Sequence, residues 1–114
     1  MSIILHITSQ TTWEQARSAG EYRGDTLARE GFIHCSTPEQ IIAVANRFYR
    51  GRQDLALLVI DRARVQAPVR DENLEGGETL FPHIYGPLNL DAVVEVVAFP
   101  PDADGGFSSL NIER

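Results

Sequence analysis

Lysine is missing from this sequence, and all ten basic residues are arginines. Without lysine the chain has neither the amine of a Schiff-base enzyme nor the lysine of a phosphate-binding P-loop. The single cysteine, Cys35, excludes a disulfide within the chain and is typical of a reducing compartment. No apolar run approaches the roughly 20 residues of a membrane helix, and the first residues lack the features of a secretion signal. We therefore expect a cytoplasmic protein that does not enter a membrane.

Acidic residues outnumber basic ones, and the net charge is −6. This balance argues against binding to long nucleic acid, which depends on the neutralisation of phosphates. A nucleotide held by a few local arginines stays compatible with it. A chain of 114 residues with 43% hydrophobic content is long enough for one modest core. We expect residues 1–114 to form a single domain, with residues 102–114 as a polar surface tail.

Hydrophobic patterning predicts about six short strands and two main helices, with the helices confined to the first half. The helices are expected to begin at the Thr11–Thr12 pair and at Thr37. Residues 55–61 are almost continuously apolar, which is typical of a central strand buried on both faces. Residues 62–70 include Pro68 and predict an edge strand, and residues 71–80 predict a mobile loop. Helices and strands do not alternate regularly, so the pattern indicates an α+β fold.

The segment 31–40 contains a predicted junction between a strand and a helix. Thr37 can cap the helix, Pro38 suits its first position, and Gln40 completes a capping box. The start of a helix presents unpaired N–H groups and the positive end of its dipole. Ser36 and Thr37 are therefore candidate phosphate-binding residues, although a capped turn without a ligand would have the same pattern.

Each of the three histidines is followed two positions later by a hydroxyl-bearing residue. The pairs are His6 with Thr8, His34 with Ser36, and His83 with Tyr85. Since side chains alternate along a strand, each pair projects from one face. The same alternation turns Cys35 away from His34, so Cys35 is interpreted as a core residue and not as a nucleophile. Three imidazoles also occur in zinc sites, but their wide spacing does not mark them as ligands, and we predict no metal site.

Glu72 stands out among the acids because it follows a predicted strand and opens the predicted loop. Catalytic and ribose-binding carboxylates are often found in such positions. A solvated surface glutamate is the alternative interpretation.

Several motifs, taken together, resemble a known family. The stretch His6-Ile7-Thr8, the segments GFIHCST (31–37) and FPHIYGPL (81–88), and the strand at 57–61 are similar to DUF952, a family of small bacterial proteins of unknown function. The resemblance extends from about Ile4 to Phe107. It implies a compact relative of the ADP-ribosyltransferase fold, a split, bent, mainly antiparallel sheet with a few helices. It also implies that His6-Ile7-Thr8 lies near the ribose of NAD. The late glutamate of those transferases has no matching motif here. Glu72 and Glu95 are candidates for it, and His83 is a candidate replacement at its position.

These observations lead to three hypotheses. In the first, the protein binds or acts on NAD or a related ribonucleotide in a cleft lined by His6, His34 and His83, with ADP-ribosyl- or phosphoryl-transferase-like activity. His34, His83 and Glu72 are then the candidate catalytic residues, and the candidate ligand-binding residues are His6, Thr8, Ser36, Thr37 and Tyr85. In the second, the same cleft is a non-catalytic module for another small metabolite or a peptide. In the third, the histidines join strands through buried hydrogen bonds.

Overall fold

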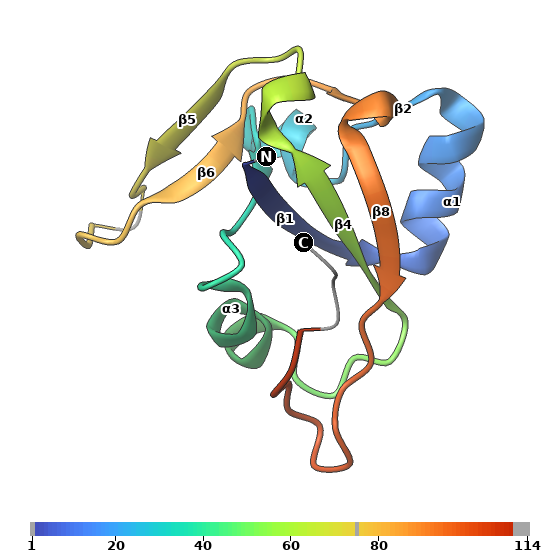
Figure 1. Cartoon of the computed structure of the whole chain (residues 1–114), viewed down its shortest axis with the longest axis vertical. Helices are drawn as coiled ribbons and strands as arrows, with labels where there is room; N and C mark the ends of the chain where they lie inside the picture. Colours follow the sequence, from blue (N-terminus) through green and yellow to red (C-terminus); the bar gives the residue numbers. More distant parts are fainter. Residues whose placement is uncertain (1, 75, 111–114) are drawn as a thin grey trace.

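A central antiparallel sheet runs through the computed structural model, which describes residues 2–74 and 76–110. Its strands are β1 (Ile3–Ser9), β4 (Leu55–Asp61) and β8 (Val93–Ala98), in the order β1-β4-β8 (Figure 1). Every residue of β4 is buried, which confirms the prediction of a central strand covered on both faces.

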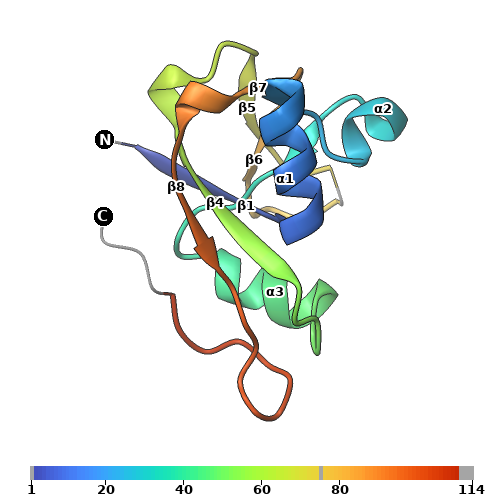
Figure 2. The same cartoon turned by 90° about the vertical axis from the view of Figure 1, so that its right-hand side faces the viewer.

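The two faces of this sheet pack into different cores. Ile4 and Leu58 face a core that contains Ala16 of helix α1 (Gln10–Ala19) and Tyr22 of strand β2 (Glu21–Tyr22). Leu5 and Leu57 face a second core that includes the buried side of helix α3 (Ile41–Phe48). Alternation along β1 and β4 therefore places α1 and α3 against opposite faces (Figure 2).

A second antiparallel sheet adjoins the first. It has the order β3-β6-β5 and consists of β3 (Ile33–His34), β6 (Phe81–Ile84) and β5 (Val69–Glu72). Leu5 of β1 and Ser36 exchange two backbone hydrogen bonds, of 2.7 and 2.8 Å, and join the two sheets. Strand β2 pairs with β7 (Leu88–Asn89); helix α2 (Thr26–Glu30) and the 3-10 turns η1 (Arg62–Arg64) and η2 (Leu90–Ala92) complete the described elements. The predicted α+β class with antiparallel pairing is confirmed.

The expected helix starts were wrong by a few residues. Helix α1 begins earlier, because the Ser9 hydroxyl accepts the N–H of Thr12 at 3.0 Å and acts as the cap. Helix α3 begins only at Ile41. The Gln40 side chain accepts the N–H of Thr37 at 2.9 Å and donates to the carbonyl of Leu80 at 2.7 Å. These two bonds hold residues 37–40 as a turn tied to the start of β6, so the capping-box contact forms without a helix at Thr37.

Two other expectations need correction. Glu72 does not open a loop, because it is the last residue of β5 and pairs with Phe81. The segment after Pro101 is not wholly on the surface, because Phe107 is buried and stacks on Phe99 with ring centroids 4.8 Å apart. Asn46 of α3 accepts the N–H of Phe107 and donates to its carbonyl, both at 2.8 Å. Residues 111–114 lie outside the described residues. Nowhere in 2–74 and 76–110 is a helix long and apolar enough to cross a membrane.

Candidate functional site

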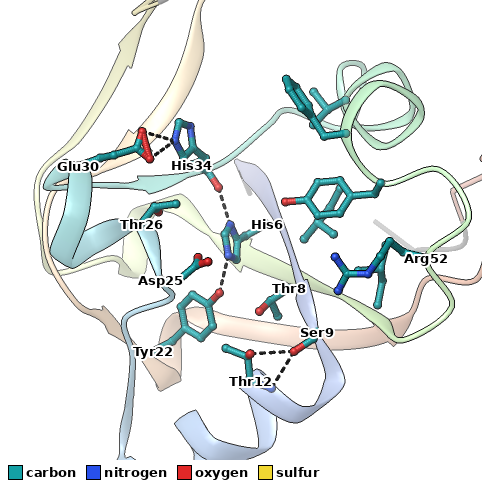
Figure 3. Close-up of a pocket in the computed structure, with 15 residues that line it drawn as sticks. His6, Thr8, Ser9, Thr12, Tyr22, Asp25, Thr26, Glu30, His34 and Arg52 are labelled. Atoms are coloured by element: carbon teal, nitrogen blue, oxygen red, sulfur yellow. Dashed lines mark hydrogen bonds and ion pairs between the residues drawn. The ribbon is translucent and has the colours of Figure 1, made fainter.

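A cavity of about 600 Å³ opens where the end of β1 meets α1, the β2–α2 segment and α3 (Figure 3). One part of its wall carries hydroxyl groups, and another carries apolar and aromatic side chains. Charged side chains also line it. The hydroxyl-bearing residues are Thr8, Ser9, Thr12, Tyr22, Thr26 and Tyr49; the apolar ones are Ile7, Val44, Phe48 and Leu55; the charged ones are Asp25, Glu30 and Arg52. His6 and His34 complete the wall, which suits a small polar ligand with a ring.

His6 is held by hydrogen bonds at both ring nitrogens. Its Nδ1 lies 2.5 Å from the backbone carbonyl of His34, and its Nε2 lies 2.6 Å from the hydroxyl of Tyr22 (Figure 3). A carbonyl only accepts, so Nδ1 carries the proton and donates it. Nε2 is then the acceptor in a neutral imidazole, and the Tyr22 hydroxyl donates to it. The contacts thus define one tautomer and one orientation of His6.

The environment keeps both partners uncharged. Burial lowers the pKa of His6 from 6.5 to about 4, and the bond to the His34 carbonyl opposes this shift in part. Burial raises the pKa of Tyr22 to about 12, with the hydrogen bond to Thr8 acting in the opposite direction. At neutral pH the floor of the cavity is therefore a neutral array of Thr8, Tyr22 and His6.

His34 lies at the rim of the cavity with its side chain 50% exposed. Its Nε2 lies 3.3 Å from both carboxylate oxygens of Glu30 (Figure 3). On the other side its ring meets His83 edge-on at a centroid distance of 5.5 Å, and Phe32 packs against both imidazoles at 4.8 Å. The side chain of His34 therefore links the cavity to the second sheet.

His83, Glu72 and Tyr85 form a compact cluster beyond His34. The His83 side chain is 5% exposed, and its Nδ1 lies 3.4 Å from Glu72 Oε1 without the geometry of a hydrogen bond. The Tyr85 hydroxyl donates to the same oxygen of Glu72, which raises the pKa of Tyr85. Burial and the neighbouring His34 lower the pKa of His83. The cluster therefore places a neutral imidazole beside a carboxylate that already accepts the Tyr85 hydroxyl.

The structure brings some of the predicted site residues together and separates others. His6, Thr8 and His34 line the cavity, whereas His83, Glu72 and Tyr85 do not. The three imidazoles thus form a row, His6 to His34 to His83, and not the wall of one cleft. Ser36 lines a neighbouring cavity instead.

The expected phosphate site at Ser36 and Thr37 lacks the unpaired donors on which it depended. The N–H of Ser36 is bound by the carbonyl of Leu5, and that of Thr37 by the side chain of Gln40. Strand pairing and the delayed start of α3 are the physical reason. These two backbone donors are therefore already engaged within the protein, and an anion site at Ser36 and Thr37 stays a prediction.

Several wall residues were missed from the sequence. No pattern in the sequence marked Tyr22, yet it is 2% exposed and bonded to His6. Its strand has two residues, which is too short for a periodic signal. No sequence motif indicated that Asp25 and Arg52 line the cavity.

Cys35 was interpreted correctly: it is buried in the core, and burial raises the pKa of its thiol. In the described part of the chain, no group of three or more His, Cys, Asp and Glu side chains is arranged to hold a metal ion.

These features define a small α+β protein of antiparallel sheets with a histidine- and hydroxyl-lined cavity. The chain belongs to the DUF952 family, described as a protein of unknown function, whose model matches residues 7–96. A crystal structure of the protein CC0527 from Caulobacter crescentus is similar, with 31% identity, 92% of each chain covered and a TM-score of 0.83. A solution NMR structure of CC0527 gives 33% identity, covers 93% of this chain and 91% of that one, and has a TM-score of 0.81. The comparison with curated proteins gives no match.

Proposed function

We propose that the cavity at the end of β1 binds NAD or a related ribonucleotide. The observation that carries this proposal is that His6 and Thr8 project from one face of β1 into a cavity of about 600 Å³, with His6 neutral and fixed in orientation. This volume is within the roughly 300–1,000 Å³ of small-molecule sites. The hydroxyls of Thr8 and Tyr22 suit a ribose, whose own hydroxyls both donate and accept. His6, which is bonded at both ring nitrogens, holds the Tyr22 hydroxyl in place.

The fold supports the same proposal. Two three-stranded antiparallel sheets that meet at the Leu5–Ser36 bridge are compatible with the split, bent sheet of an ADP-ribosyltransferase relative. The first strand of such a relative presents a histidine to the ribose, and His6 occupies β1 here. Fold likeness alone does not define an activity, so the residues of the cavity carry the argument.

The charges of the wall suggest how the ligand lies. Asp25 and Glu30 suit the positive charge of an oxidised nicotinamide ring, and Arg52 suits a phosphate. Arg52 is held by Asp54 through bonds of 3.0 and 3.1 Å, so its guanidinium has a defined direction. Arg52 takes over the phosphate-binding role that the sequence assigned to Ser36 and Thr37.

Ligand binding is expected to stabilise the protein against unfolding. At about 100 times its dissociation constant, a ligand adds roughly 2.7 kcal/mol. We expect NAD, ADP-ribose or a 2′-phosphorylated nucleotide to raise the melting temperature, and Arg52→Gln to reduce the rise. Arg17→Gln is the matched control, because Arg17 is also ion-paired and exposed but does not line the cavity. A thermal-shift panel at millimolar ligand measures this, and no shift with any of the nucleotides contradicts the proposal.

The proposal extends to catalysis, with His34 as the candidate catalytic residue. His34 lines the cavity and its ring also contacts His83, which in turn lies beside Glu72. If the protein turns its ligand over, His34→Ala should abolish turnover while the thermal shift largely survives, because His34 holds His6 through its backbone carbonyl and not through its ring. Chromatographic detection of ligand cleavage over time measures the first quantity. Full turnover by the variant would remove His34 from the chemistry.

A non-catalytic binding module is the second candidate. The two carboxylates Asp25 and Glu30 favour it, because they suit any small metabolite with a cationic group. In the same panel, a shift with polyamines or amino sugars and none with nucleotides would select this candidate.

A further inference from the structure

A second cavity of about 530 Å³ adjoins the first one. It lies between β3, α3 and the three residues Asn73, Gly77 and Thr79. The two cavities share three wall residues, His34, Val44 and Phe48. The two cavities therefore adjoin along these three side chains, beside α3 and β3.

Phe48 is the unexpected member of this boundary. Its side chain is 57% exposed, although the guanidinium of Arg47 lies 4.9 Å from the ring centroid. Large exposed aromatic residues at the edge of a cavity are typical of ligand contacts, since a ligand ring can stack on them and remove them from water. The core does not require Phe48 to lie there, because Ile41 and Ala45 form the buried side of α3.

The walls of the two cavities differ in chemistry. The first contains two carboxylates, Arg52 and most of the hydroxyl groups, whereas the second contains Arg47, Ser36 and the apolar side chains of Ala43 and Phe81. A ligand with one unit in each cavity would contact His34 and Phe48 at its middle. Such a ligand gains affinity because the second unit binds at a high effective concentration once the first is in place.

We propose that the two cavities are subsites for one ligand built of two ring-bearing units, such as a dinucleotide. Its cationic, hydroxyl-bearing unit lies in the first cavity and its second ring stacks on Phe48 at the entrance of the second. This inference rests on the proposed function and deepens it, because it selects a dinucleotide over a mononucleotide.

Calorimetric titration of the whole chain with NAD and with nicotinamide mononucleotide tests this inference. We expect NAD to bind at least about tenfold more tightly, which is the effect of one additional stacked ring. Ala43→Trp fills the second cavity from an exposed position of α3 and should lower the affinity for NAD to that for the mononucleotide, without changing the latter. Phe48→Ser should weaken NAD binding about tenfold. Leu80→Ser is the matched control, because Leu80 is 54% exposed and lines neither cavity.

The outcomes separate this inference from the proposed function. If neither compound binds the unaltered protein, the proposed function fails, and the inference fails with it. If both bind equally, and Ala43→Trp and Phe48→Ser change neither affinity, the first cavity is a nucleotide site and the two-subsite inference is overturned. If Ala43→Trp removes only the advantage of NAD, the inference holds.

Discussion

Acidification from pH 7 to pH 4 should cost the unaltered protein about 3 kcal/mol more in free energy of unfolding than it costs a His6→Gln variant. The unfolded chain protonates His6 below its ordinary pKa of 6.5, whereas the folded protein resists protonation until about 4. Between these values the unfolded state binds more protons, so stability falls as the pH falls. A difference between 6.5 and about 4 corresponds to about 3 kcal/mol. The cause is structural: a protonated Nε2 can no longer accept the Tyr22 hydroxyl.

Urea denaturation of both proteins at pH 7, 5.5 and 4 measures this difference. The remaining titrating groups are common to both chains, so the difference between the two stability curves reports His6. Glutamine retains a donor and an acceptor but does not titrate in this range. Parallel pH dependences for the two proteins would show that His6 is readily protonated in the folded state.

Phe107→Ala is expected to lower the free energy of unfolding by about 3–5 kcal/mol, the usual cost of truncating a buried phenylalanine. Phe107 is 5% exposed, stacks on Phe99 and lies in the core that covers the Leu5 face of the central sheet. Its removal leaves a space between that sheet and α3. The two backbone bonds to Asn46 limit how far the segment can shift to fill this space.

Ser109→Ala is the control for this variant, because Ser109 is exposed and only two positions away. It should change stability by less than about 0.5 kcal/mol. Urea denaturation at pH 7 compares both with the unaltered protein. A loss below about 1 kcal/mol for Phe107→Ala would mean that residues 102–110 are an appendage, as the sequence suggested.

Local periodicity predicted much of the fold because it depends on neighbouring residues. The continuous apolar run 55–61 identified the central strand, and alternation placed His6 and Thr8 on one face of β1 and Cys35 in the core. The burial of Phe107 was not predictable in this way, since it depends on Asn46, 61 residues earlier in the chain. Tyr22 was missed for a similar reason: its place under His6 comes from tertiary packing and not from a pattern.

For the candidate site, too, local patterns were predictable from the sequence and tertiary packing was not. Alternation predicted that each histidine shares a face with a hydroxyl, but it carries no information on which strands meet. Pairing of β3 with β6 sets His34 opposite His83, and the Leu5–Ser36 bridge brings β3 beside β1. His6 and His34 therefore share one cavity while His83 lies behind it. Whether any of these residues acts on a ligand stays a prediction.

The contact between His6 and residue 34 runs through a main-chain carbonyl, and this has an evolutionary consequence. Every amino acid supplies that carbonyl, so residue 34 can vary while the orientation of His6 persists. Its side chain, half exposed at the rim, can therefore be exchanged without breaking the bond that orients His6. A library randomised at residue 34 would therefore vary the rim of the cavity while the orientation of His6 is kept.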